Sequence, residues 1–454
     1  MKRNVISCWP VAAALCLLLS LASCSKDSKA DLSDLLSTVP AEADMVVAVD
    51  VKSTLEKAGA KVSGGKIELT GQLKDALAKA DARSRESIEA VLQGDAGVRP
   101  TSLVAFAKGY HVWVTGILDD PSKFREYVGR SEPSLKWQEE SGVSYAGRYA
   151  VSGDQFWCYD KPGVDPLEVK SFIGLGDKKS FLSTDYAEKM TEGDYQMRGI
   201  VSTSSRMVGG DSFVKQAQMQ MALQTLFSDA AYIGFTLEMD NEECQVRGQM
   251  LTSSFKPAPY NLPVARIDSK TISSLNASGD MAFAVGTNSK LVEKIQGMLS
   301  QTGAVGKLYN TIIAPIDGTV AAFVSQPDGA ERQISAVIPT DGSNLSPLTM
   351  ALEGSDMKWR REGNNLIAGT PQASSGGITS AIFAKEAGGS LLAYMADSKG
   401  LSLPAGKNPL PVKSLAVSLD SEGNSVVLKI EVKASDKKSS LPAAILLSIL
   451  GDAL

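Results

Sequence analysis

The stretch LKWQEESGVSYAG at residues 135–147 recurs as MKWRREGNNLIAG at residues 357–369. In both copies the same number of residues separates a Lys-Trp pair from an Ala-Gly pair. Matches that recur in the same order along a chain distinguish a duplication from coincidence. This stretch therefore predicts that one structural unit occurs twice in the chain.

Predicted elements on both sides of this stretch also match in order. Each half opens with an apolar strand and a helix, continues with a strand hairpin and a short proline-initiated helix, and closes with a second hairpin. The first half also has a long polar helix, predicted at 72–92. The expected strands are 44–49, 103–107, 111–118, 232–239 and 245–250 in the first half, and 280–285, 320–325, 333–338, 415–419 and 426–432 in the second.

Sequential hairpins with helices between them are typical of antiparallel sheets. The expected fold class is therefore α+β, a tandem duplication of antiparallel hairpin sheets with helices packed on one face. Alternation of Ser418 and Asp420 with Val417 and Leu419 predicts that the other face is in water. The predicted segments are a signal peptide at 1–23, a tether at 24–38, a first repeat at 39–254, a proline-rich linker at 255–270, a second, shorter repeat at 271–436 and a C-terminal apolar helix at 437–454.

The N-terminus has the order of a bacterial secretory signal. Lys2 and Arg3 precede an apolar stretch at 11–21, about half of the roughly 20 residues that a membrane-spanning helix needs. The sequence Leu-Ala-Ser-Cys that ends at Cys24 looks like a lipobox, in which the cysteine thiol receives diacylglycerol before cleavage. Each buried acyl methylene contributes about 0.8 kcal/mol, so several chains anchor a protein firmly. We therefore predict a lipoprotein with lipid on Cys24, located in the cell envelope and most simply at the outer membrane. The alternative is an ordinary signal peptide followed by an unrelated cysteine.

Charge and cysteine usage exclude some classes of protein. Removal of Lys2 and Arg3 changes the formal net charge from -5 to about -7, whereas nucleic-acid-binding proteins present basic surfaces. Cys158 and Cys244 are the cysteines that remain after signal cleavage and lipidation of Cys24. A disulfide between them and two separate buried thiols both remain open.

The side chains that chemistry usually requires are scarce. His111 is the single histidine, and it lies inside a predicted strand, where histidines are usually structural. No Gly-x-Ser-x-Gly motif occurs, and a structural zinc site needs about four His or Cys ligands. We therefore predict no catalytic, cofactor-binding or metal-binding residue. A pair of carboxylates that hydrolyses glycans remains open, because such a pair needs no sequence motif.

Aromatic residues gather in one short stretch. Phe156, Trp157 and Tyr159 lie in a predicted strand, where core packing would explain them and exposure would make them a binding surface. We take these three residues as the candidate binding surface. Trp137 and Trp359 occupy equivalent places in the two halves, so we interpret them as determinants of the fold.

The segment that follows Cys24 resembles a family of lipoproteins from Bacteroidales-type bacteria, domain of unknown function 4836. The resemblance lies in VPAEADMVVAVDVKSTLEKAG at residues 39–59, where valine replaces the family's isoleucine before Pro40. It also lies in Ser180-Phe181-Leu182-Ser183 and in Gly193-Asp194-Tyr195. The resemblance implies a location in the envelope and brings no catalytic residues.

Three functions are compatible with these patterns. The leading hypothesis is a non-catalytic envelope lipoprotein that binds or scaffolds a partner, such as another envelope protein or a glycan, and that binds the membrane through its lipid. The second is a surface lipoprotein that binds or hydrolyses glycans. The third is a carrier of apolar cargo, suggested by the Met-rich segment 219–223 and by the apolar segment from Leu441. No nucleic-acid partner and no cofactor are expected.

Overall fold

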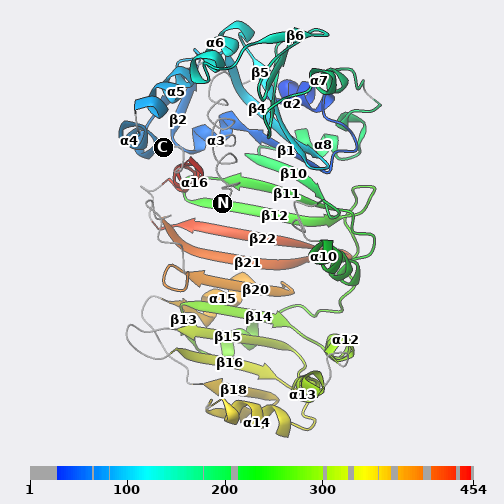
Figure 1. The fold of residues 1–454 in the computed structure, drawn as a ribbon. Coiled ribbons are helices and arrows are strands. Elements are labelled where there is room, and N and C mark those ends of the chain that lie inside the picture. The colour runs from blue at the N-terminus through cyan, green and yellow to red at the C-terminus, as the bar shows by residue number, and fades with distance from the viewer. Residues whose placement is uncertain are drawn as a thin grey trace, which may run out of the picture.

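Most strands of the computed structural model form one long antiparallel sheet that runs the length of the molecule (Figure 1). The structure describes residues 28–63, 66–80, 82–176, 178–205, 213–299, 304–325, 332–355, 357–369, 377–401, 411–435 and 440–450. Within these ranges the sheet has 18 strands. From one end to the other they follow the order β6 (Gln138–Glu140), β7 (Val143–Ala146), β8 (Tyr149–Ser152), β9 (Gln155–Tyr159), β5 (His111–Leu118), β4 (Val98–Lys108), β1 (Met45–Asp50), β10 (Met197–Ser202), β11 (Tyr232–Met239), β12 (Glu243–Leu251), β22 (Ser425–Ala434), β21 (Val412–Glu422), β20 (Leu392–Asp397), β14 (Met281–Gly286), β15 (Thr319–Ser325), β16 (Gln333–Pro339), β18 (Asn365–Gly369) and β17 (Trp359–Glu362).

Two short strand pairs lie outside this sheet. They are β2 (Ala60–Ser63) with β3 (Lys66–Leu69), and β13 (Ser278–Gly279) with β19 (Ile378–Thr379). The mixed helix-and-strand composition and the large antiparallel sheet confirm the α+β class.

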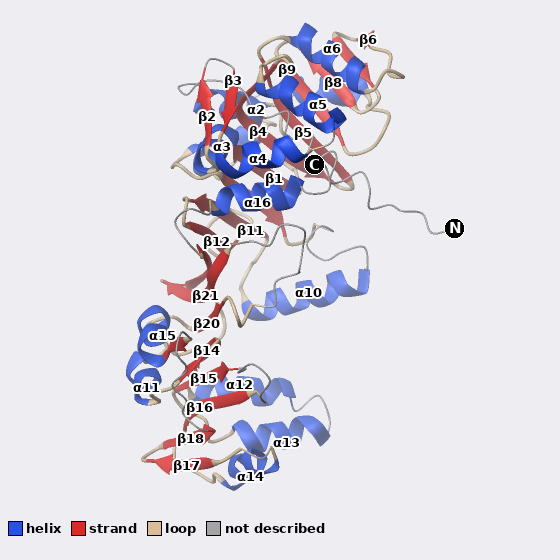
Figure 2. Cartoon of the chain, turned by 90° about the vertical axis from the view of Figure 1, so that its left-hand side faces the viewer, coloured by secondary structure: helices blue, strands red, loops and turns tan. Residues whose placement is uncertain are grey.

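Helices cover both faces of the sheet, which corrects the prediction that they pack on one face (Figure 2). On the first face lie α2 (Ser28–Ser37), α7 (Pro166–Ile173), the 3-10 helix η1 (Phe181–Ser183), α8 (Ala187–Thr191), α11 (Ser269–Ser274) and α15 (Ser380–Ala387). On the second face lie α3 (Val51–Lys57), α4 (Gly71–Lys79), α5 (Ala82–Leu92), α6 (Pro121–Ser131), α10 (Phe213–Leu226), α12 (Ser289–Leu299), α13 (Ala304–Ile313), α14 (Ser346–Gly354) and α16 (Leu441–Leu450).

The sequence of β4 shows why helices pack on both faces of the sheet. Val104 and Phe106 point into one core with Trp113, whereas Leu103 points into another core with Phe124 and α16. A strand that is buried on both sides has a nearly continuous apolar sequence instead of an alternating one. The run Leu103–Ala107 has this character, although the sequence pattern predicts only that it is a strand.

The predicted tether is also corrected. Residues 24–27, including Cys24, lie outside the described residues, but Ser28–Ser37 form helix α2. Leu35 and Leu36 of this helix are fully buried against Phe106 and Trp113. The buried carboxylate of Asp31 accepts hydrogen bonds from Arg99, at 3.0 Å, and from Thr101. Leucines spaced at i, i+3 and i+4 from Leu32 form an apolar stripe that the polar flanking residues concealed.

The other predicted helices and strands are present in the structure, but some of their boundaries differ from the prediction. The predicted hairpins are all present as antiparallel pairs: β4–β5, β15–β16, β11–β12 and β21–β22. The helix expected at 72–92 is two helices, α4 and α5, because the backbone is extended at Ala80. The predicted C-terminal helix is α16, and its Leu446 and Leu447 complete the core between the sheet and α3 to α6.

The segment predicted as a linker lies against the sheet. Ala258 is fully buried, and Ala258 N–H donates to the carbonyl of Met250 at 2.8 Å. The strands before and after this segment belong to the same sheet, because β12 pairs directly with β22. We call the line between β12 and β22 the seam.

Candidate functional site

A row of cross-strand partners on the first face changes from apolar to polar and back to apolar. In an antiparallel sheet, directly paired residues point to the same face, so this row can be followed across the molecule. The row is Val104, Ala48, Arg198, Thr236, Arg247, Lys429, Ser418, Ala393, Ala284, Ala321 and Val337. Helices α2, α7 and α8 cover its first end, and α11 and α15 cover its last end.

The polar middle of this row is the floor of two adjoining cavities that share Glu422. The larger cavity, of about 570 Å³, lies beside α15, and the smaller, of about 340 Å³, lies beside α8. We call the two cavities together the trough. Its polar lining consists of Tyr186, Lys189, Tyr195, Thr236, Gln245, Arg247, Gln249, Arg266, Glu386, Ser390, Tyr394, Ser418, Asp420, Ser421, Glu422, Lys429 and Glu431.

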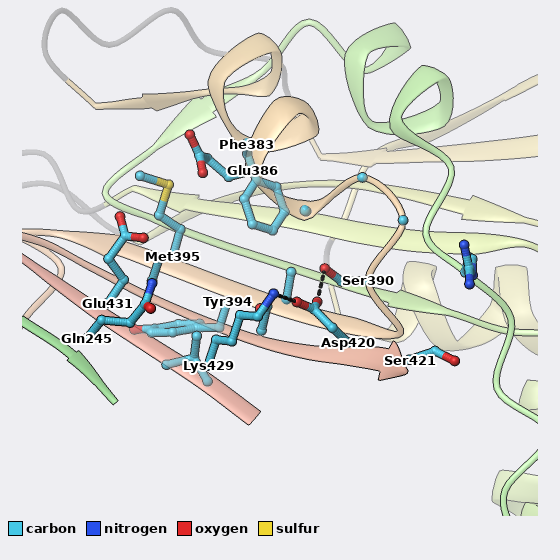
Figure 3. A pocket seen from close by; sticks show the side chains of 18 of the residues that line it. Gln245, Phe383, Glu386, Ser390, Tyr394, Met395, Asp420, Ser421, Lys429 and Glu431 are labelled. Carbon is cyan, nitrogen blue, oxygen red and sulfur yellow. Dashed lines mark hydrogen bonds and ion pairs between the residues drawn. The ribbon is translucent and has the colours of Figure 1, made fainter. Parts of the chain in front are cut away.

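The larger cavity holds a hydrogen-bonded group centred on Asp420 (Figure 3). The Asp420 carboxylate accepts a hydrogen bond from Ser390 Oγ at 2.7 Å, and its other oxygen lies 2.6 Å from Lys429 Nζ. Burial would raise the pKa of Asp420, but the hydrogen bonds from Lys429 and Ser390 outweigh it and lower that pKa below its ordinary value. The carboxylate therefore stays ionised, and these three side chains hold each other in place.

Other groups in the larger cavity are free to meet a ligand. The side chains of Gln245 and Arg266 form no hydrogen bond or salt bridge with any residue that the structure describes, and the Glu386 carboxylate interacts with Lys433 through its charge alone. Figure 3 shows Gln245, Glu386 and Glu431 together at one end of the cavity, with Ser390 and Asp420 toward the other. Arg266 lies near Ser390, since the next residue, Ile267, donates its N–H to the Ser390 carbonyl at 2.7 Å.

An acidic group lies beside this end of the trough. Lys433 Nζ lies 2.5 Å from Glu431 Oε1, and the neighbouring carboxylates raise the pKa of Lys433. Burial first, and then the charge of Glu431, raise the pKa of Glu243. One lysine thus lies among three carboxylates: Glu243, Glu386 and Glu431.

The wall of the smaller cavity depends on a glycine. Gly234 lies under Tyr186, and a Cβ at this position would lie 2.8 Å from the tyrosine hydroxyl. Behind this wall, the buried Arg198 donates to main-chain carbonyls at the end of α8, including that of Lys189 at 2.7 Å. Arg247 forms a salt bridge of 3.0 Å with Glu422 on the trough floor.

No family model matches this chain. A search of curated proteins also found no match. Among solved structures, crystal form IV of TP0453 is similar over 47% of this chain and 79% of its own length, with 13% sequence identity and a TM-score of 0.31. Crystal form III of TP0453 is 10% identical, with a TM-score of 0.26, over 77% of this chain and 96% of its own. Likeness at these TM-scores supports no inference about this chain.

The candidate binding surface at Phe156, Trp157 and Tyr159 was wrong. Phe156 and Trp157 are 0% exposed and Tyr159 is 8% exposed. They alternate between two cores, because β9 lies between β8 and β5 with helices over both faces. None of the three lines the trough.

The remaining sequence candidates also lie away from the trough. His111 is the exposed first residue of β5, where its Nδ1 contacts the Tyr159 hydroxyl. Cys158 and Cys244 are free, buried thiols in different cores. Burial, followed by the charge of Glu243, raises the pKa of the Cys244 thiol to about 11. In the part of the chain that the structure describes, no group of three or more His, Cys, Asp or Glu residues is placed to hold a metal ion.

The sequence contained a signal for the trough. The alternation of Ser418 and Asp420 with apolar residues predicted a wet sheet face, and Gln245, Arg247 and Gln249 alternate in the same way. No local pattern indicates that these two strands come close together, because β12 and β22 pair across about 180 residues.

Proposed function

We propose that this chain is an exported cell-envelope lipoprotein that binds a partner in the trough and performs no catalysis. One observation carries the proposal. The first face is covered by helices at both ends of the sheet, and its hydrogen-bonding middle is left open between them. A polar, mixed-charge strip that includes Gln245 and Arg266, whose side chains form no hydrogen bond or salt bridge with the described residues, suits a hydrated partner that brings hydrogen bonds of its own.

The envelope location remains a proposal that rests on the sequence. The lipobox at Cys24 and the resemblance to the domain of unknown function 4836 lipoproteins support it. Two of the segments that carry this resemblance, 39–59 and 180–183, lie together, because Phe181 N–H donates to the Val39 carbonyl at 2.7 Å. Among the described helices, none is long and apolar enough to cross a membrane.

We also propose that the two halves arose by tandem duplication, at 39–254 and 271–436. The order of strand pairing supports this. β1 pairs with β4 and β10 as β14 pairs with β15 and β20, and the last two strands of each half follow in the same way. The Trp137 indole donates to the Arg125 carbonyl at 3.2 Å, and the Trp359 indole donates to the Glu353 carboxylate at 3.3 Å, so each reaches the preceding helix. The trough then lies where the two repeats meet.

The structure removes part of the support for the two rival functions, which are glycan binding or hydrolysis and the carriage of apolar cargo. The aromatic surface proposed for glycans is buried, and the apolar C-terminal segment is packed into the core. Met219 and Met221 are 41% and 68% exposed on α10 and remain compatible with an apolar cargo. Both rivals are outcomes of the following experiment.

The experiment is chemical cross-linking in membranes of cells that produce the lipidated protein, followed by purification. The trough variant Gln245→Ala/Arg266→Ala/Glu386→Ala removes three side chains that form no hydrogen bond or salt bridge with the described residues and keeps the Ser390, Asp420 and Lys429 group. At about 1 kcal/mol for each lost hydrogen bond, it should weaken binding on the order of a hundredfold. The matched control Glu86→Ala/Gln93→Ala/Lys123→Ala alters exposed residues elsewhere and should keep the partner.

The same preparations test the anchor. The wild-type chain should incorporate labelled palmitate and sediment with membranes, whereas Cys24→Ala should do neither. A wild-type protein recovered without any partner, or a trough variant that retains the partner, would refute the binding site. A glycan or lipid recovered in place of a protein would favour a rival function.

A further inference from the structure

The two ends of the large sheet are strands β6 and β17, which lie at opposite ends of the molecule (Figure 2). In the described structure β6 pairs only with β7, and β17 pairs only with β18. Every residue of both strands is exposed. Each strand therefore presents one row of main-chain N–H and C=O groups to solvent, which another chain can pair with.

The two edges carry charges of opposite sign. β6 contains Glu139 and Glu140, whereas β17 contains Arg360 and Arg361. Arg360 forms an exposed salt bridge of 2.7 Å with Glu362. Because exposed salt bridges of this kind contribute little, Arg360 is free to exchange it for another carboxylate.

Charged edge strands ordinarily prevent sheets from associating. In this molecule, like charges would oppose a β6–β6 or a β17–β17 contact, whereas opposite charges favour a β6–β17 contact. The charge pattern therefore selects one of the three pairings between copies.

Strand direction permits the same pairing. Every pairing in the sheet is antiparallel, so β6 and β17, at the two ends of an even number of strands, run in opposite directions. A second copy in the same orientation then places its β6 antiparallel to β17. One register pairs Glu139 with Arg361 and Glu140 with Arg360.

We propose that copies of this chain associate head to tail, with β6 of one copy pairing with β17 of the next. The contact is heterologous and does not close on itself, so association extends step by step with concentration. It is independent of the partner proposed for the trough.

Two charge-reversed variants test the pairing: Glu139→Lys/Glu140→Lys, which has two basic edges, and Arg360→Glu/Arg361→Glu, which has two acidic edges. The measurement is sedimentation equilibrium of the full lipidated protein, at low salt, in a buffer that matches the density of the detergent. The control Glu86→Lys/Glu89→Lys makes the same charge change as the first variant on exposed positions of α5.

The weight-average mass of the wild type and of the control should rise with concentration. Each edge variant alone should remain a monomer, and an equimolar mixture of the two should regain association, because it restores opposite charges at every contact. A wild type that is monomeric at all concentrations would overturn the proposal, and so would edge variants that associate as the wild type does or a mixture that stays monomeric.

Discussion

Glu243 lies beside the trough residue Glu431, and its carboxyl makes the stability of the fold depend on pH. Its carboxyl is partly buried beside Glu431, and both burial and that charge raise its pKa above the ordinary value of 4.5. The folded state therefore holds this proton at pH values where the unfolded state has released it. By linkage, the free energy of unfolding falls as the pH rises from about 4.5 through the raised pKa.

We expect Glu243→Gln to remove this decline. Glutamine keeps the shape and the neutral state of the protonated acid, so the variant should be more stable than the wild type at pH 8 and nearly equal at pH 4.5. Urea denaturation at both pH values measures the difference. Glu238→Gln, on the exposed part of β11, is the control and should leave the wild-type slope unchanged. An equal slope in Glu243→Gln and wild type would contradict the assignment.

Single residues also show where sequence reasoning failed. Phe156, Trp157 and Tyr159 belong to a strand whose side chains alternate between two cores, so all three are buried although they are consecutive or nearly so. A short aromatic run has the same appearance whether one face or both faces are covered. The cover comes from α2, α6 and α7, and nothing in the run itself shows that these helices pack over it, so the run alone could not distinguish the two cases.

At the scale of elements, α2 is the clearest departure from expectation. Its leucines fill the core on the first face, and Asp31 joins it to Arg99 at the start of β4. Such a helix is part of the folded body and not a spacer. The lipid proposed for Cys24 would then be joined to the folded body through the short segment 25–27.

We expect Leu35→Ala to reduce the free energy of unfolding by about 2–5 kcal/mol, because Leu35 is fully buried and alanine leaves a cavity. Leu32→Ala, on the same helix but only partly buried, should reduce it less. Thermal and urea denaturation of the two variants make the comparison. If Leu35→Ala were no more harmful than Leu32→Ala, α2 would not be docked as described.

Local elements were predictable and their partners were not. Turn residues and alternation located the β4–β5 and β21–β22 hairpins, since each pairs neighbours in sequence. The proline in Asp120-Pro121 located α6, whose first turn is capped by Asp120. The β12–β22 pairing, which creates the trough, joins strands from the two halves and has no local signature.

At the scale of the whole molecule, one sheet joins the two halves across the seam. We expect both halves to unfold in one transition, because separating them exposes the main-chain ladder between Cys244 and Val432 and its neighbours. In the variant Trp359→Phe, the tryptophans of the folded body, Trp113, Trp137 and Trp157, all lie in the first half. Their fluorescence should follow the same urea curve as far-ultraviolet circular dichroism, and two separate curves would show that the halves are independent.

The core of the first half cannot be completed until helix α16 has been synthesised. This helix follows β22 in the sequence, yet its Leu446 and Leu447 lie among residues of the first half such as Leu55 and Phe124. During synthesis, some 300 residues emerge between the last described strand of that core and the helix that seals it, so the nascent N-terminal part stays incomplete while the rest is made. This delay would favour the export proposed above, because a chain that has not finished folding on the ribosome can still pass through a translocation channel.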